Sequence, residues 1–569
     1  MDIRTGYSGR TIFLTGGTGF VGKVTLFKIF KEFPDVNTIY ILMRGKKSRK
    51  FKKYLSPQER LELEVLGSPC FDPLRSEIGD GQWNALKKKV KAINGDITQD
   101  FLGISPEERE TLFQSVNFVI HLAATVNFNE RLDNAVQMNT LGGLRVLSLA
   151  RHMHKLEAMV HVSTCYVNYP RHGRENVNEE KIYPLDCDPE AMVKNILGMQ
   201  PAEVEEVSRT LLKQYGFSNT YTFTKSLGER LILRYRNDVP LVIVRPSIIG
   251  ASYKEPMPGW VDALTAAGGL MLTAALGVVR EVVVKKECIA DVVPVDCVVN
   301  IILKALFKTQ QYYRHERQLA PPAEHASPAA APSAPQPVGI TLNVKSSTPS
   351  NAMVPPTATA TTEATPTGFS EPSVRLHNPT TGEDLPLIYQ ACVTAGGYGP
   401  SWERLTNSLR RFMATSNKPH PKGLSKCDIT LTDSQAYFYL RYYLLRYTPY
   451  LLTQALVSLP EPIGSPKKAK MVEKWGRAVR RSLLLNKEFK DFILVEWIYD
   501  NANSKSLDVG LDEVSQRKFA YDPSSIQWSY YTQLYTYGIF KHIVRETGAL
   551  QCPTAPPSPT DIFDKAAKM

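Results

Sequence analysis

A tyrosine and a lysine are spaced so that they can act together on a carbonyl group. Tyr221 and Lys225 lie four residues apart, where residues 223–236 have a helical pattern, so both side chains fall on one helical face. A lysine ammonium beside a phenol favours the phenolate and lowers its pKa. The tyrosine can then act as a general acid near neutral pH, donating a proton to a carbonyl oxygen as hydride arrives at carbon. The alternative is an exposed helical pair without a chemical role.

A second group of residues has the spacing needed to bind a dinucleotide. Residues 11–22 read TIFLTGGTGFVG, in which a buried strand runs into three spaced glycines and then a helix. The first glycine permits a tight turn, the second lets the backbone approach a pyrophosphate, and the third lets the helix pack close to the sheet. The phosphates would lie at the helix N-terminus, where unpaired N–H groups point outward. The predicted cofactor-binding residues here are Thr15, Gly16, Gly19, Phe20, Val21 and Gly22.

Charged residues after two further strands indicate which dinucleotide binds. The strand predicted at 38–43 ends at Arg44. An acidic residue there would bind the ribose 2′-hydroxyl of NAD, whereas an arginine suits the 2′-phosphate of NADP. Asp96 and Ile97 follow another predicted strand, and the Asp96 carboxylate could accept a hydrogen bond from the adenine amine. We therefore predict NADPH as the cofactor, the alternative being that Arg44 is a solvated strand-end residue.

The elements that must position these residues alternate along the first half of the chain. The strands are rich in β-branched residues and lack period-2 polarity, which is typical of strands buried on both faces. Strand–helix alternation predicts an α/β fold, a Rossmann-type doubly wound parallel sheet. The predicted strands are residues 11–15, 38–43, 118–121, 159–163 and 241–245, and the predicted helices are residues 23–33, 131–155 and 223–236.

The second half of the chain divides differently. Residues 318–370 are rich in Pro, Ala, Ser and Thr, have few charges and cannot bury enough apolar surface to offset their ordering entropy. Further on, Tyr, Leu and Arg recur with helical spacing, which predicts a C-terminal, mainly helical domain. The expected organisation is an NADP-binding domain at 1–312, a Pro/Ala-rich linker or insertion at 313–372, completion of the first domain at 373–420, the helical domain at 421–546 and a flexible tail at 547–569.

Composition and charge narrow the class of protein. The chain has 569 residues, of which 43% are hydrophobic and 22% charged, and this composition excludes a wholly disordered or fibrous chain. The net charge of +12 suits anionic small molecules or an acidic membrane surface, and without a dense basic block interleaved with aromatic residues we predict no nucleic-acid partner. Eight scattered cysteines without zinc spacing predict a reduced intracellular protein without a metal site. No uncharged apolar run reaches about eighteen residues, so no membrane-spanning helix is expected.

Together the motifs resemble the extended branch of the short-chain dehydrogenase/reductase superfamily. The G-x-x-G-x-x-G loop and the Y-x-x-x-K pair are that superfamily's motifs, and HLAA at 121–124 matches its small residues under the adenosine, including Ala123. The resemblance implies that Lys225 also holds the nicotinamide ribose. It further implies a hydroxyl that holds the substrate oxygen, for which Thr164 is the first choice and Ser163 the second.

Several longer segments narrow the resemblance to the alcohol-forming fatty acyl-CoA reductases. They cover most of residues 8–312 and 374–545, whereas the Pro/Ala-rich segment departs from the pattern. That segment is inserted before a late strand, 373–378, that the first domain still needs, so its removal should matter little and loss of the residues after it should matter more. The segments are VHVSTCYVN at 160–168, RPSIIG at 245–250, PGWVD at 258–262, DVVPVD at 291–296 and FKDFILVEWIYDNAN at 489–503.

The resemblance implies reduction of a long-chain acyl-CoA by two NADPH through an aldehyde to a fatty alcohol, without a metal, in support of ether-lipid or wax synthesis. One alternative is a related reductase that stops at the aldehyde or acts on a sterol or a carrier-bound acyl group. Another is a non-catalytic NADP-binding scaffold, against which the intact Tyr221, Lys225 and Thr164 argue.

Two segments bear on location. Residues 440–456 combine Tyr and Leu with two arginines, which favours peripheral membrane contact, although Pro449 should kink or break a helix there and the residues could equally form a domain core. The chain ends Ala567-Lys568-Met569, a small–basic–aliphatic tripeptide of the kind that peroxisomal import receptors read. We therefore expect a peroxisome or glycosome, the alternatives being the endoplasmic reticulum surface or the cytoplasm.

Overall fold

The computed structural model describes residues 1–48, 51–173, 175–264, 266–319, 375–377, 384–416, 419–460 and 465–554. Its centre is a seven-stranded sheet whose paired neighbours all run parallel, in the order β15-β9-β7-β6-β1-β2-β5. This confirms the predicted α/β fold class. The strands are β1 (Ile12–Thr15), β2 (Ile39–Met43), β5 (Val90–Asn94), β6 (Phe118–His121), β7 (Ala158–Val162), β9 (Leu241–Pro246) and β15 (Ile388–Ala391).

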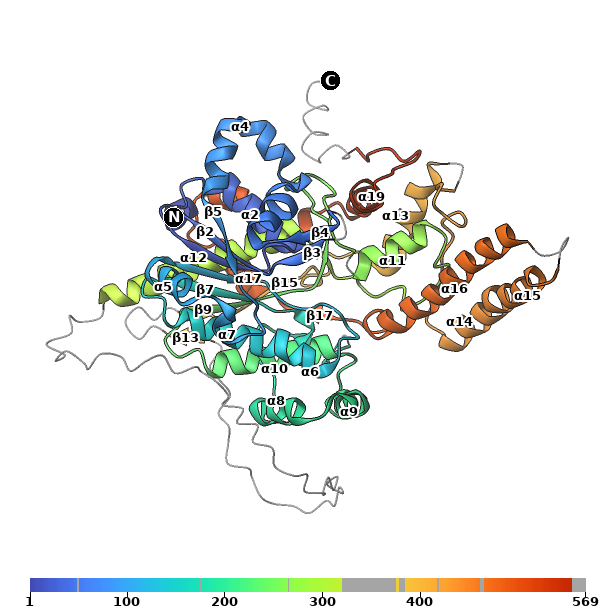
Figure 1. The fold of residues 1–569 in the computed structure, drawn as a ribbon, viewed down its shortest axis with the longest axis horizontal. Coiled ribbons are helices and arrows are strands. Elements are labelled where there is room, and N and C mark those ends of the chain that lie inside the picture. The colour runs from blue at the N-terminus through green and yellow to red at the C-terminus, as the bar shows by residue number, and fades with distance from the viewer. Residues whose placement is uncertain are drawn as a thin grey trace, which may run out of the picture.

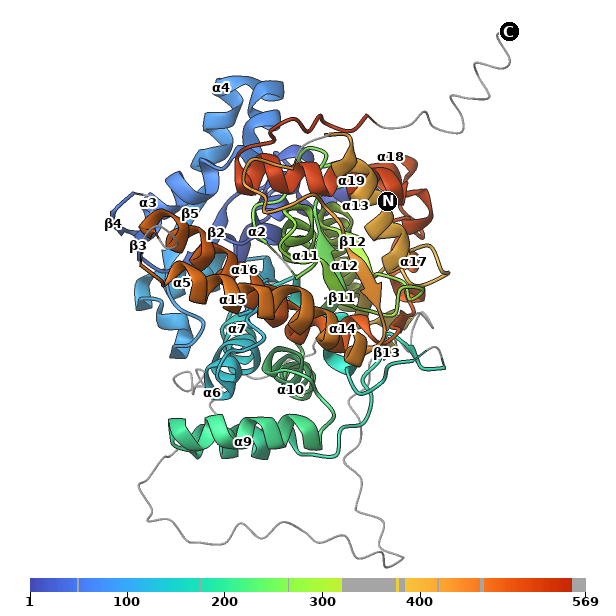
Figure 2. The same cartoon turned by 90° about the vertical axis from the view of Figure 1, so that its right-hand side faces the viewer.

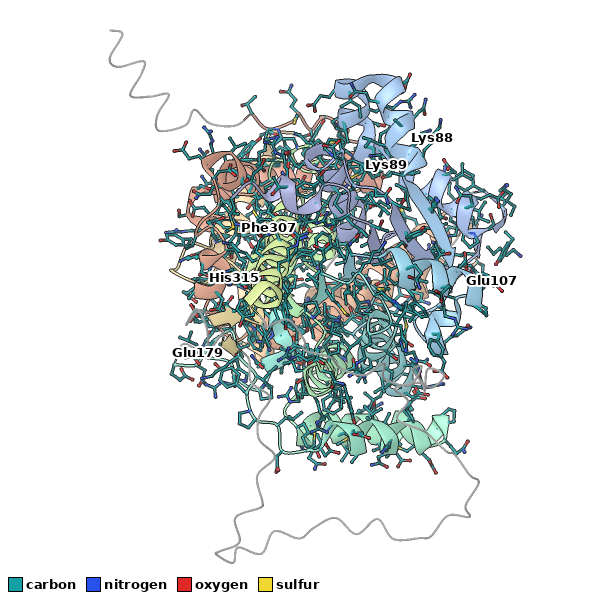
Figure 3. All side chains as sticks on the ribbon, turned by 90° about the vertical axis from the view of Figure 1, so that its left-hand side faces the viewer. Lys88, Lys89, Glu107, Glu179, Phe307 and His315 are labelled. Carbon is teal, nitrogen blue, oxygen red and sulfur yellow. The ribbon has the colours of Figure 1, made fainter. Side chains whose placement is uncertain are left out.

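Burial explains why the central strands are recognisable from sequence. Every residue of β1, β2 and β6 is buried, as expected of parallel strands covered on both faces. In Figure 1 the sheet lies between α2 (Phe20–Glu32) and α12 (Val295–Leu319) on one side and α7 (Leu141–Ala150) and α10 (Thr220–Arg234) on the other. Figure 3 views the side where α12 crosses the sheet and labels Phe307 and His315 on that helix.

The late strand predicted at 373–378 does not enter the main sheet. Residues 375–377 form β13 (Arg375–His377), which pairs antiparallel with β14 (Asp384–Pro386). The seventh strand of the sheet is β15, which pairs with β9. Both β14 and β15 belong to the 373–420 segment. Helix α12 extends to Leu319, so the predicted linker at 313–372 begins inside a helix, and residues 320–372 lie outside the described residues.

The C-terminal half is mainly helical, and part of it projects from the molecule. Helices α14 (Gln435–Tyr442), α15 (Thr448–Val457) and α16 (Pro466–Ile493), with the π-helical turn η6 (Tyr443–Tyr447) between the first two, form a projection that we call the arm. The arm extends away from the sheet in Figure 1 and lies across the facing side in Figure 2. The helix runs without interruption from α14 through η6 into α15, so the break expected at Pro449 is absent. The π-helical turn before Pro449, in which the Thr448 amide bonds to the Tyr443 carbonyl oxygen, accommodates the proline.

The remaining helices and small strands surround these parts. Strand β17 pairs with β8, which joins the C-terminal half to the segment before Tyr221. Among the described residues, no helix is both long and apolar enough to cross a bilayer. The other elements are α1 (Ile3–Tyr7), β3 (Lys46–Ser48), β4 (Lys53–Leu55), α3 (Pro57–Arg60), α4 (Asp72–Lys88), α5 (Pro106–Ser115), α6 (Leu132–Ala135), β8 (Val177–Asn178), α8 (Pro189–Gly198), α9 (Pro201–Gln214), β10 (Ile248–Gly250), α11 (Ala266–Ala275), β11 (Glu281–Val283), β12 (Val292–Pro294), α13 (Trp402–Ala414), β16 (Thr430–Thr432), β17 (Ile498–Tyr499), α17 (Ala502–Ser506), α18 (Glu513–Lys518) and α19 (Trp528–Gly538).

Candidate active site

The predicted tyrosine–lysine pair lies on α10, against the carboxyl end of β7. Asn219 begins this helix, and its side chain accepts a hydrogen bond from the Thr222 amide. The Lys225 ammonium donates to the carbonyl oxygen of Val162, the last residue of β7, at 2.9 Å. The Tyr221 hydroxyl shares a hydrogen bond with the Thr164 hydroxyl just beyond the same strand. The structure therefore brings Tyr221, Lys225 and Thr164 to one place.

Burial, rather than the lysine, controls the protonation of this tyrosine. Removal from water raises the pKa of Tyr221 to about 12, and its hydrogen bond with Thr164 opposes that rise. Burial also lowers the pKa of Lys225 to about 8, while the nearby Glu229 carboxylate opposes the fall. The expected lowering of the Tyr221 pKa by Lys225 is therefore not observed. A phenol that keeps its proton at neutral pH is suited to donate it.

The two candidate hydroxyls beyond β7 have different surroundings. Thr164 donates to the Pro246 carbonyl oxygen at 3.3 Å, accepts from the Tyr166 amide and bonds with Tyr221. The Ser163 hydroxyl is buried and has no hydrogen-bond partner among the described residues. A buried hydroxyl without a partner is costly unless a ligand completes its bonding. Ser163 thus has a hydroxyl proton free for a substrate oxygen, whereas Thr164 would first have to release the Pro246 carbonyl oxygen, and the assignment between them stays a prediction.

The glycine loop has the shape of a phosphate cradle. Gly16 has a φ of +76°, and a Cβ there would lie 2.8 Å from the Ala123 amide nitrogen. A Cβ at Gly22 would lie 2.4 Å from the Gly16 carbonyl oxygen, so α2 could not approach the loop with a larger residue. Gly19 begins α2 without a side-chain cap, which leaves the amides of Phe20 and Val21 available to an anion. This loop fits the pyrophosphate of a dinucleotide.

The residues predicted to select the cofactor contact one another. The Arg44 guanidinium lies 2.8 Å from the Asp96 carboxylate, and its side chain is 64% exposed. The Asp96 carboxylate also accepts hydrogen bonds from the amide and the hydroxyl of Thr98. Partial burial alone would raise the pKa of Asp96, but its contacts with Thr98 and Arg44 hold that pKa below its usual value. Ile97 is buried against the helix beyond β6, where a Cβ on Gly142 would meet its side chain at 3.1 Å. These residues form one side of the predicted adenosine site.

A pair of buried histidines beneath the loop was missed by sequence reasoning. Thr15, His121 and His161 face one another across β1, β6 and β7. Thr15 shares a 2.7 Å hydrogen bond with the His121 Nδ1 and accepts from the Ala123 amide, so it ties the loop to β6. Burial and the Lys225 charge lower the pKa of His121 to about 3, so the ring is neutral beside the lysine. Only the register of the strands reveals this cluster.

A buried ion pair on the same helix face was also missed. Glu229 follows Lys225 by one helical turn, and its carboxylate bonds the Arg245 guanidinium at 2.6 and 3.0 Å. Both side chains are fully buried, and Arg245 also donates to the Lys181 carbonyl oxygen. Because Arg245 belongs to β9, the pair fixes α10 against the sheet. The spacing of four residues from Lys225 is the signal that could have identified Glu229.

Aromatic residues from distant parts of the chain complete the site. The Phe128 and Phe492 rings stack with centroids 5.3 Å apart, and Phe128 also packs against Tyr221 at 5.7 Å. Tyr166 meets Phe492 edge-on at 5.1 Å. With Phe489 these side chains line an apolar cavity that reaches the Tyr221 side chain. The site is therefore a phenol donor at one end of an apolar cavity, near the dinucleotide cradle.

Comparisons with known proteins agree with this arrangement. Over 299 residues the chain is 39% identical to fatty acyl-CoA reductase 1 of Homo sapiens, covering 52% of this chain and 55% of that protein. It is 38% identical over 312 residues to a putative fatty acyl-CoA reductase of Drosophila melanogaster, covering 55% of this chain and 56% of that protein. The match thus spans about half the length of these curated relatives. The terminal R domain of the myxalamid PKS-NRPS biosynthetic pathway shares the fold, with a TM-score of 0.52 and 15% identity over 96% of this chain and 93% of that one.

Family models decide the assignment. A model described as male sterility protein matches residues 14–302, which is half of the chain and contains the loop, the hydroxyls and the tyrosine–lysine pair. A second model with the same description matches residues 463–546, within the C-terminal half. These findings confirm the resemblance to fatty acyl-CoA reductases. They also agree with the predicted enzyme class, an oxidoreductase. The chain belongs to the male sterility protein family.

Proposed function

We propose that this protein reduces long-chain acyl-CoA to a fatty alcohol in two steps at the Tyr221 site. The observation that carries the proposal is that the Tyr221 phenol, protonated at neutral pH, lines an apolar cavity beside the dinucleotide cradle. An apolar cavity suits a hydrocarbon chain, and a protonated phenol suits a carbonyl oxygen that becomes negative as it is reduced. The relatives' names support acyl-CoA as the substrate class.

The chain's own residues supply binding and protons. NADPH, when bound, supplies one hydride in each step, and the loop at Gly16–Gly22 with Lys225 would hold it. In the first step Tyr221 protonates the thioester oxygen to give a hemithioacetal. The hemithioacetal then loses its hydroxyl proton and expels the CoA thiolate, which takes up a proton, to leave an aldehyde. In the second step Tyr221 protonates the aldehyde oxygen to give the alcohol. Thr164 or Ser163 donates a hydrogen bond to the same oxygen, and solvent returns each proton to Tyr221.

The preference for NADPH over NADH is part of the proposal. Arg44 stands at the end of β2, is largely exposed and meets Asp96 at the adenosine side of the cradle. A guanidinium in this position favours a 2′-phosphate through a charge-assisted contact. Turnover in parallel with NADPH and NADH at equal concentration tests it, and equal rates would refute the preference.

Stoichiometry tests the reaction itself. Full reduction consumes two NADPH for each free CoA thiol released, and both quantities can be followed spectrophotometrically in one reaction. A ratio of one would identify an aldehyde-forming reductase. No NADPH oxidation with any acyl-CoA would identify a cofactor-binding scaffold. We expect a ratio of two, with the alcohol available to ether-lipid or wax synthesis.

We also propose that the arm contacts a membrane. Exposed leucines concentrate there: Leu440, Leu444 and Leu452 are each 62% exposed. The first turns of α16 add a basic cluster, formed by Lys467, Lys468, Lys470 and Lys474, all exposed. Apolar side chains next to basic ones favour the interface of an anionic bilayer, and a monomer rarely leaves so large an apolar surface uncovered.

Vesicle flotation tests the contact. We expect the protein to float with vesicles that contain phosphatidylserine, and the triple variant Leu440→Glu, Leu444→Glu, Leu452→Glu to stay at the bottom of the gradient. Val509→Glu is the matched control, because Val509 is 70% exposed and lies outside the arm. Equal flotation of the triple variant and the parent would contradict the proposal, as would an unbound parent.

The proposed location is a peroxisome or glycosome. It rests on the terminal tripeptide Ala567-Lys568-Met569, which lies outside the described residues, and on the lipid-synthetic role proposed above. Fluorescent fusions at the N-terminus, with and without the tripeptide, should give punctate and diffuse signals respectively. Two identical diffuse signals would refute targeting by this tripeptide.

A further inference from the structure

The cavity at Tyr221 continues into a second apolar cavity. Both cavities are lined by Ala267, Leu270 and Trp402. No charged side chain lines either one among the described residues. The two cavities therefore adjoin at these three residues, and we call them together the channel; Tyr221 lines its first cavity, and the second extends along the helix that begins at Trp402. The second cavity alone is lined by Met271, Ala274, Val282, Val284 and Leu409, among others.

Helix α11 lines the channel with a single stripe of side chains. Ala267, Leu270, Met271 and Ala274 have the spacing i, i+3, i+4 and i+7, which places them on one helical face over about 10 Å of helix length. The stripe has an alanine at each end. Small side chains at both ends leave room between α11 and the opposite wall, which α13 forms.

The far end of the channel lies close to the arm. Strand β11 (Glu281–Val283) and the residue after it alternate in direction: Val282 and Val284 line the channel, whereas Val283 packs into the arm's own core with Phe438 and Tyr442. One strand thus separates the channel from the helices that carry the exposed leucines.

We propose that this channel holds the hydrocarbon chain of the acyl-CoA, with the thioester at Tyr221, and that Ala274 and Leu409 at its far end set the longest chain accepted. The proposal rests on the proposed function and adds the chain site and its length determinant. A hydrocarbon chain is the occupant that a long, narrow, uncharged channel fits, since each buried methylene gains about fourfold in affinity. A channel of fixed length then selects among acyl chains of different length by where the terminal methyl group lies, while the carbonyl group is held in the same place for all of them.

Substitution at the far end separates long from short substrates. Ala274→Leu should lower kcat/KM about tenfold or more for stearoyl-CoA and leave octanoyl-CoA within about twofold, because only the longer chain reaches position 274. Leu409→Ala should shift the optimum toward longer chains. Gly269→Ala is the matched control on the same helix, because a Cβ there has nothing within 4 Å, and it should keep the parental profile.

The outcomes distinguish failure of the proposed function from failure of the proposed chain site. If the parent reduces no acyl-CoA of any length, the proposed function fails. If the parent reduces acyl-CoAs and both Ala274→Leu and Leu409→Ala keep its chain-length profile, the chain does not lie in this channel. If Ala274→Leu loses stability and all activity, the opposite shift expected of Leu409→Ala decides: a shift toward longer chains supports the channel, and an unchanged profile overturns it.

Discussion

Replacing Tyr221 with phenylalanine should lower the rate of acyl-CoA reduction by about 10²–10⁴-fold, the usual contribution of a general acid. The change keeps the ring that packs against Phe128 and removes only the hydroxyl that bonds with Thr164. Binding of NADPH, measured by fluorescence, should be retained because the glycine loop is untouched. The rate is measured as NADPH oxidation with palmitoyl-CoA.

Tyr166→Phe is the control for this experiment. Tyr166 lines the same cavity and its ring packs edge-on against Phe492, but no contact joins its hydroxyl to Thr164 or Lys225 among the described residues. This variant keeps the ring and should keep its rate within about tenfold, since a neutral hydroxyl outside the reacting group contributes about 1 kcal/mol. A Tyr221→Phe enzyme as active as Tyr166→Phe would show that another group donates the proton.

Breaking the Glu229–Arg245 pair should have the largest effect on stability. Arg245→Met leaves the fully buried Glu229 carboxylate without its partner, and removing one member of such a pair costs about 3–5 kcal/mol of the free energy of unfolding. Because Glu229 lies on α10, the same change should loosen the helix that carries Tyr221 and Lys225. Chemical denaturation of the purified variants measures the loss.

Two further variants make this test specific. Arg234 lies on the same helix as Glu229 and forms a partly exposed pair with Asp188, which caps α8. Arg234→Met breaks this pair and should cost less than about 1 kcal/mol of the free energy of unfolding. The double variant Glu229→Met, Arg245→Met should recover part of the lost stability, because no uncompensated charge remains. Equal costs for Arg245→Met and Arg234→Met would contradict the role assigned to the buried pair.

The sequence predicts the central sheet and the tyrosine–lysine pair for physical reasons. Strands β1, β2 and β6 are buried on both faces, so their apolar runs are continuous, and a spacing of four residues suffices to place Tyr221 and Lys225 on one helical face. At the edges of the sheet the pattern of continuous apolar residues is weaker. β5 has exposed residues at Lys91 and Asn94, and β15 follows a long Pro/Ala-rich segment, so sequence reasoning places the last strand at 373–378 instead of Ile388–Ala391.

What could not be predicted depends on contacts between distant residues. The pKa of Tyr221 is raised rather than lowered because the fold partly removes the phenol from water, in a cavity whose lining includes Phe128 and Phe492, more than three hundred residues apart. The unpartnered Ser163 hydroxyl and the neutral His121 ring likewise depend on strand register and burial. Periodicity and spacing describe one segment at a time and do not contain this information.

Product analysis tests the central claim most directly. Purified protein, excess NADPH and palmitoyl-CoA should yield hexadecanol as the main product in gas chromatography, with hexadecanal only as a minor species. Accumulation of hexadecanal without hexadecanol would contradict alcohol formation. Absence of both products, with NADPH still bound by the protein, would contradict the assignment of Tyr221 as the proton donor for acyl-CoA reduction.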